Sequence, residues 1–302
     1  MQTLEDSIAY TKRKKHFQLY GSDVDLLNKR ITDLSRYLKG EETLGSVALN
    51  LDRLSTYYHW SFIELSVNTN TIEMSTLAKA SYIAFETNNW YEFLGKKVAK
   101  YSSAVSFNTA VKHLGQLLYL GQYDKAKQYG NLLMKMLYGK QYDGGLVYPT
   151  HPWFMLELFC RWQGKALDKK GTRYPENLGV YQTALDNWDT GDTQLLSDIV
   201  DSLTEFHIAQ SDEDVTTDEY GNEFSPEFTS SNYFIFPIEI LMWLAIRKHL
   251  GLPDYIASPS NELMSMPINQ LPDTPVEWVK DDLVNQCKAK LKADNPDIEF
   301  AL

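Results

Sequence analysis

The sequence predicts an all-α protein in which antiparallel helical hairpins pack irregularly around one central apolar helix. Apolar residues recur at helical spacing along most of the chain, whereas alternating runs closed by Asn-Gly or Asp-Gly, typical of β-hairpins, are nearly absent. One segment, 232–253, is apolar on almost every face. With 302 residues, 43% hydrophobic and 13% aromatic, the chain can bury a large core. We expect a single domain over 1–302, with a subdivision near residue 145 as the alternative.

The first clear helix is expected after Ser22, which would cap its start. Its apolar stripe is Leu27, Ile31, Leu34 and Leu38, and Gly40 would end it. Segments 45–67 and 71–87 repeat the same stripe, so each predicts one long amphipathic helix.

Two helical hairpins are expected further along. Residues 113–140 read as two helices joined at Gly121, where small residues would allow close approach. This segment resembles one tetratricopeptide hairpin, but no second copy follows at a period of about 34 residues. Residues 178–207 read as a second hairpin, with its turn at Asp189 to Gly191. Further helices are expected near Trp153 and over 276–292.

The apolar segment 232–253 is the predicted central helix. Pro237 suits its first turn because a proline has no N–H to leave unpaired there, and Glu239 would meet the positive end of the helix dipole. Arg247 lies two turns further on, and we expect it to emerge at the rim or to pair with an acid.

Several classes of protein are disfavoured. The start has no apolar region of the kind that follows a basic stretch in a signal peptide, and no segment is long enough to cross a bilayer. Cys160 and Cys287 lack metal-ligand spacing and suit a reducing compartment, so we expect a cytoplasmic protein that does not bind a membrane. The basic cluster at 12–16 reads as a solvated helix face and not as a nucleic-acid site, because the chain carries a net charge of -11.

The acidic charge is concentrated in one quarter of the chain. From Tyr174 to Ile246 there is no Lys or Arg against fifteen acids, whereas the rest of the chain carries 29 bases and 25 acids. Like charges in close proximity repel, so such a segment either keeps the protein soluble or attracts a basic partner. The fifteen are Glu176, Asp186, Asp189, Asp192, Asp198, Asp201, Glu205, Asp212, Glu213, Asp214, Asp218, Glu219, Glu223, Glu227 and Glu239.

No catalytic motif is present: the chain lacks a Gly-rich phosphate loop, HExxH, GxSxG and paired CxxC. Asp212, Asp214 and Asp218 miss the spacing of an EF-hand. We therefore expect no enzyme, no metal and no cofactor. The alternative is a hydrolase or metal site gathered from His207 and nearby carboxylates; otherwise His207 caps the end of its helix.

Three stretches, "LTEFHIAQSDED", "FPIEILMWLAIRKHLGLP" and "SPSNELMSMPINQLP", resemble the immunity protein 49 family. These are all-α immunity proteins of bacterial polymorphic toxin systems. The matching positions are His207, Phe236-Pro237, Glu239, Arg247, Gly251 to Pro253 and Leu271-Pro272, and the match covers about a third of the chain. Ile208 and Ala209 stand where family members place aromatic residues. The resemblance implies a protein that neutralises a cognate toxin.

Charge and resemblance together predict an inhibitor that binds a basic toxin, such as a nuclease effector, through the segment 212–227. The predicted contacts are Asp212, Glu213, Asp214, Asp218, Glu219, Tyr220, Glu223, Phe224 and Glu227, with roles left open for His207, Pro237, Glu239 and Arg247. The alternative function is a tetratricopeptide-like scaffold, which would bind partners in a groove formed by residues 113–140.

Overall fold

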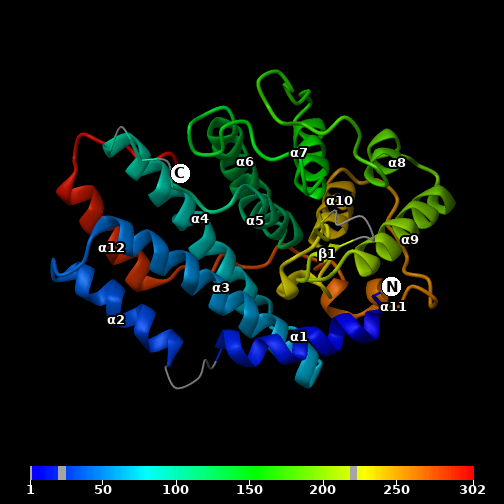
Figure 1. Ribbon diagram of the computed structural model, residues 1–302, viewed down its shortest axis with the longest axis horizontal. Helices are drawn as coiled ribbons and strands as arrows, with labels where there is room; N and C mark the ends of the chain where they lie inside the picture. Colours follow the sequence, from blue (N-terminus) through cyan, green and yellow to red (C-terminus); the bar gives the residue numbers. More distant parts are fainter. Residues whose placement is uncertain (1, 20–24, 99, 102, 218–222) are drawn as a thin grey trace.

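The computed structural model describes residues 2–19, 25–98, 100–101, 103–217 and 223–302, with backbone only for 15–18, 216–217 and 223–224. Within these residues the chain is all-α apart from one ladder of two short strands (Figure 1). The α-helices are α1 (Leu4–Leu19), α2 (Leu26–Leu38), α3 (Leu44–Thr69), α4 (Met74–Lys97), α5 (Phe107–Tyr119), α6 (Tyr123–Leu137), α7 (His151–Trp162), α8 (Tyr181–Asp186), α9 (Thr193–Ala209), α10 (Ile238–His249), α11 (Glu262–Ser265) and α12 (Asp282–Asp294). The strands are β1 (Thr216–Thr217) and β2 (Glu223–Phe224), and two 3-10 turns cover Ser231–Tyr233 and Pro267–Asn269.

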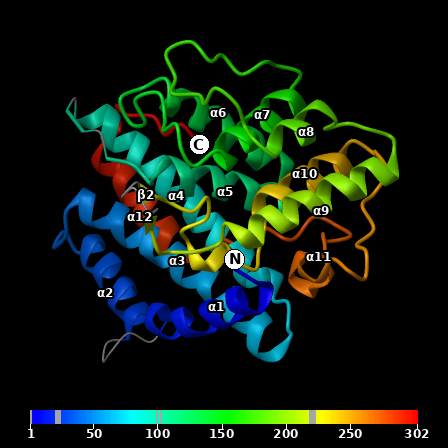
Figure 2. The same ribbon diagram turned by 45° about the vertical axis from the view of Figure 1, so that its right-hand side comes forward.

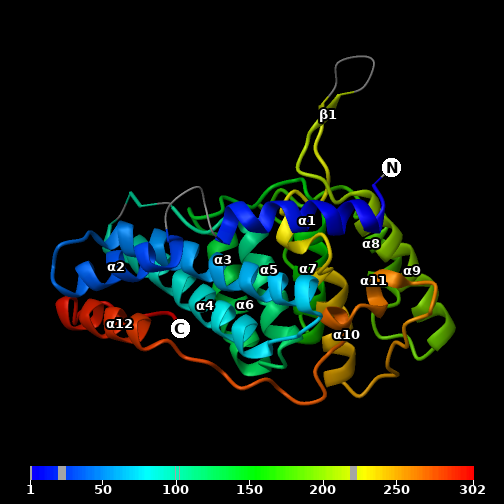
Figure 3. The same cartoon turned by 90° about the horizontal axis from the view of Figure 1, so that it is seen from below.

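The helices follow one another across the molecule in nearly sequential order. Helices α2 to α4 form one end, α5 to α7 the middle, and α8 to α11 the other end (Figure 1). Helix α1 runs along the molecule, with its N-terminal end beside α11. An extended tract then runs back beneath the molecule and brings α12 beside α2, as Figure 3 shows. One cluster of buried apolar side chains includes residues from Leu19 to Leu291. None of the helices described is long and apolar enough to span a membrane.

Local capping fixes where most of these helices start. The helix expected after Ser22 starts at Leu26, because the side chain of Asp25 accepts the backbone N–H of Asn28; Ser22 lies outside the described residues. Asp192 caps α9 by accepting the N–H groups of Gln194 and Leu195. The expected turn at 189–191 is confirmed.

The last helix starts later than predicted. Residues 276–281 stay extended, because the Val276 N–H bonds the carbonyl of Leu120 and the Asp281 side chain caps Val284. Trp278 packs edge-on against Tyr82 and Phe85, which holds this tract against α4. Tertiary contacts thus override the local helical pattern.

The prediction of a central apolar helix is confirmed. Every residue of α10 from Ile238 to Arg247 is buried, and α10 packs against α5, α7 and α9. Burying one Leu or Ile side chain contributes about 1.5–3 kcal/mol, so this helix alone supplies a large share of the hydrophobic stabilisation.

The hairpin joined at Gly121 is also confirmed. Gly121 has φ +72°, a left-handed conformation that favours glycine. Gly115 on α5 lies where a side chain would meet Ile238 of α10, and Gly130 on α6 lies directly against the ring of Phe159. Small residues therefore set how closely α5 and α6 approach their neighbours.

We predict that Gly130→Ala lowers the free energy of unfolding by about 1–3 kcal/mol, because the new methyl group overlaps the buried Phe159 ring. Gly45→Ala is the matched control: no atom lies within 4 Å of the added carbon, and alanine favours a helix by up to about 1 kcal/mol. Urea unfolding measures both. Equal stability of the two variants would contradict this packing.

Candidate functional site

Helix α9 presents a row of carboxylates to solvent. Asp198, Asp201 and Glu205 are spaced three and four residues apart, which places them on one helix face. Asp198 and Glu205 are exposed, and Asp201 is half-buried. In the part of the chain that the structure describes, no Lys or Arg forms an ion pair with any of the three. Their negative charge is therefore available to a partner.

A pocket of about 290 Å³ opens beside this row, between α9, α11 and the start of α1. Leu4, Ile208 and Leu263 are its apolar lining, and three acids line it as well: Asp201, Glu205 and Glu262. Asn261 positions one of these acids, because its side-chain N–H donates to Asp201 at 2.6 Å and to Thr204 at 3.2 Å. Figure 2 shows α9 and α11 at the same end of the molecule. We call this pocket and the α9 carboxylates the acidic face.

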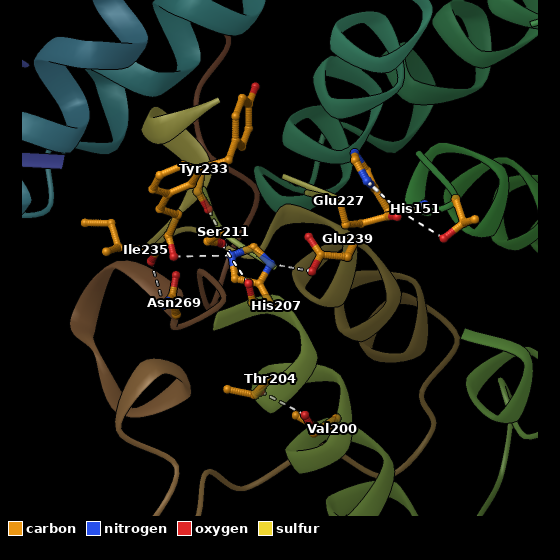
Figure 4. Close-up of polar contacts among 12 residues, drawn as sticks. His151, Val200, Thr204, His207, Ser211, Glu227, Tyr233, Ile235, Glu239 and Asn269 are labelled. Atoms are coloured by element: carbon orange, nitrogen blue, oxygen red, sulfur yellow. Dashed lines mark hydrogen bonds and ion pairs between the residues drawn. The ribbon is translucent and has the colours of Figure 1, made fainter. Parts of the chain in front are cut away.

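The C-terminal end of α9 is tied to α10 by His207 (Figure 4). The fully buried imidazole places Nδ1 2.7 Å from the Glu239 carboxylate, and Nε2 faces the carbonyls of Tyr233 and Phe234 at 3.1 and 3.3 Å. The ring thus bridges the Glu239 carboxylate and two backbone carbonyls. His207 therefore joins α9 to α10 and not merely to carbonyls of its own helix.

The N-terminal side of α9 is tied to α10 by Arg247. Its guanidinium donates to the carbonyls of Trp188, Thr190 and Pro253 at 2.8 to 3.2 Å. The expectation that Arg247 emerges at the rim or pairs with an acid is wrong, because the side chain is 1% exposed and binds backbone carbonyls of the α8–α9 turn. Pro237 lies just before the first residue of α10.

The predicted contact Glu227 is wrong, because its carboxylate is inside the protein and 1% exposed. One oxygen accepts the backbone N–H of His151, the hydroxyl of Thr150 at 3.0 Å and Nδ1 of His151 at 3.0 Å. It caps the start of α7, where the helix dipole favours a negative charge. Burial would raise the pKa of Glu227, but the bonds from His151 and Thr150 outweigh it and lower that pKa.

The paired stretches 211–217 and 223–228 form a projection from the helical body. Ser211 bridges Phe228 at its base, and β1 pairs with β2 beyond it, standing out from the helices in Figure 3. Glu213 turns back to the body: Lys14 lies 2.7 Å away, and Tyr10 and Ser231 donate to it. Partial burial would raise the pKa of Glu213, but the contacts with Lys14, Ser231 and Tyr10 outweigh it and lower that pKa.

The remaining predicted contacts are only partly described. Asp214 is exposed and Asp212 half-buried. Asp218, Glu219 and Tyr220 lie outside the described residues, and for Glu223 and Phe224 only the backbone of β2 is described. The structure thus places Glu213 and Glu227 in internal contacts and leaves Asp214 open to solvent.

A buried layer of charged and polar groups lies under the acidic face. Phe228 stacks on the ring of His151 and makes a tilted contact with the ring of His207. Lys112, 1% exposed, places Nζ 4.7 Å from the centre of the Tyr233 ring. Burial lowers the pKa of Lys112 to about 8, against the attraction of two carboxylates. Among the described residues, no three His, Cys, Asp or Glu side chains form a group that could hold a metal ion.

The sequence prediction placed the contact surface in 212–227 and not on α9. It counted Asp198, Asp201 and Glu205 among the acids but did not select them as contacts, although their helical spacing was visible. Glu262 lay outside the segment altogether. No local signal marks its approach to α9, because that contact depends on the fold between α10 and α11.

We predict that stability falls as the pH drops below 6.5. Burial lowers the pKa of His59 and of His113 to about 3 from 6.5. The unfolded chain therefore binds protons that the folded chain does not, so the stabilisation is complete above pH 6.5 and is lost as the pH falls toward 3. The slope is about 1.4 kcal/mol per pH unit for each histidine. Urea unfolding from pH 7.5 to 4.5 measures it. His113→Gln should flatten the dependence, and an unchanged slope would contradict the assignment.

Comparison with known proteins gives no assignment: no family model, no curated protein and no solved structure matches this chain.

Proposed function

We propose that this protein is a cytoplasmic immunity protein that binds a basic antibacterial toxin through the acidic face and neutralises it without chemistry. The observation that carries the proposal is the row of three carboxylates on α9, two exposed and one half-buried, that no Lys or Arg of the described chain neutralises. Unpaired charge of one sign repels itself and costs stability, a cost that binding an oppositely charged partner offsets.

The acidic face suits a protein partner because it combines charge with apolar surface. A Lys or Arg side chain has a long apolar stem and a charged end. Leu4 and Ile208 can pack against such a stem while Asp201, Glu205 and Glu262 meet its charge. A protein that presents several basic groups, as a nuclease does around its phosphate site, would match both features.

The need for rapid binding also favours a surface with concentrated negative charge. A toxin must be captured before it acts, and a concentrated field of one sign raises the rate of encounter with a partner of the opposite sign. The sequence resemblance to the immunity protein 49 family supports this proposal independently of charge.

The scaffold alternative is weakened by the position of its hairpin. A tetratricopeptide-type groove needs an open helix face, whereas α5 is buried from Ala110 to Tyr119 between α4, α6, α7 and α10. Residues 113–140 therefore offer no groove on α5.

The partner can be found by expressing the protein together with each neighbouring open reading frame. We expect one neighbour to stop growth alone, to be tolerated with this protein, and to co-purify with it. If no neighbour is toxic alone, the proposal fails.

With that partner, we predict that Asp198→Lys combined with Glu205→Lys slows association by about tenfold or more, because both changes reverse exposed charge on the acidic face. The matched control is Glu277→Lys with Asp297→Lys, which reverses two exposed acids elsewhere. Surface plasmon resonance at low and high salt measures the rates. Equal rates for the two double variants would show that binding occurs at another surface.

A further inference from the structure

A second pocket, of about 170 Å³, shares no lining residue with the pocket of the acidic face. It is formed by the last turns of α10, by residues 253–257 and by residues 264–271. Cavities of about 150 Å³ hold a molecule the size of benzene, so the space suits a small organic molecule.

Arg247 lines this pocket and is not fully satisfied. Its two terminal nitrogens donate to backbone carbonyls, but Nε is buried and has no hydrogen-bond partner. In the described chain no carboxylate lies within ion-pair distance of Arg247. Burial lowers its pKa, against the attraction of Asp189 and Asp254. A buried cation without a counter-ion is costly, because backbone carbonyls replace the lost hydration only in part.

The pocket wall also carries a second cation, Lys248, and a buried amide, Asn269. Lys248 lines the same pocket, with Nζ 2.9 Å from the carbonyl of Pro272 and 3.8 Å from Asp273. Asn269 donates both amide hydrogens to the carbonyls of Ile235 and Leu263, which fixes its orientation and leaves its buried Oδ1 without a donor. The wall thus has two cations and two buried oxygens without a partner in the described chain, Asn269 Oδ1 and the hydroxyl of Tyr255. The exposed Asp254 is the one acid lining the pocket.

We propose that this pocket binds a small carboxylate that carries a neighbouring N–H or O–H group. The carboxylate would sit at Arg247 and Lys248 and supply the missing negative charge, and the N–H or O–H would donate to Asn269. Asp254 disfavours a molecule with more than one negative charge. The site is separate from the acidic face, so the proposal does not depend on the proposed function.

N-acetylglycine is the test probe because it has one carboxylate and one adjacent N–H. N-acetylglycinamide is its neutral match in size and shape. We expect amide signals of residues 244–271 to shift with N-acetylglycine in NMR titrations, with an affinity at least about tenfold higher than for the neutral amide. Equal affinity, or no binding of either probe, would overturn the proposal and leave water as the occupant of the pocket.

Two variants locate the binding without disturbing the carbonyl contacts of Arg247. Ala257→Leu fills the pocket and should abolish binding while the thermal midpoint stays within a few degrees of the original protein. Lys248→Gln should weaken binding about fivefold or more, and Lys290→Gln, whose partner is Asp294 on α12, is the control that should leave it unchanged. Binding that persists in Ala257→Leu would place the probe elsewhere.

Discussion

The structure depends on the two charged side chains that α10 carries within its buried length. Glu239 binds His207 at the C-terminal end of α9, and Arg247 binds the carbonyls that precede its N-terminal end. Burying single charges is costly. Three backbone carbonyls hold Arg247, whereas His207 holds Glu239 through one carboxylate oxygen and the other oxygen is buried without a hydrogen-bond partner among the described residues. The apolar surface of α10 fixes its place in the core. Because Glu239 and Arg247 bond at the two ends of α9, they also fix α9 relative to α10. A helix rich in carboxylates, which repel one another, is thereby held in one orientation.

Much of the architecture follows from local sequence. Apolar periodicity placed α2 to α4, Gly121 placed the turn between α5 and α6, and the turn at 189–191 placed the start of α9, because each signal acts within a few residues. The central position of α10 was predictable because a helix that is apolar on nearly every face is stable only when neighbours cover all of those faces.

The errors arise where distant contacts decide the outcome. Nothing near Glu227 in the sequence indicates that it caps α7, a helix that begins 76 residues earlier. In the same way, Lys14 neutralises Glu213 from the first helix. Polar neighbours in the sequence therefore made Glu213 and Glu227 look exposed, whereas their burial depends on residues that are distant in the sequence. The strand ladder was missed because its two-residue strands are too short to show alternation.

The apolar helix α10 supports an acidic surface, and we propose that this surface binds a cationic protein. Hydrogen exchange of the complex with the toxin, compared with the free protein, tests this most directly. We expect slower exchange concentrated in residues 193–209 and 258–265, because bound surface excludes water from these backbone amides. Protection confined to residues 113–140, with α9 unchanged, would contradict the account.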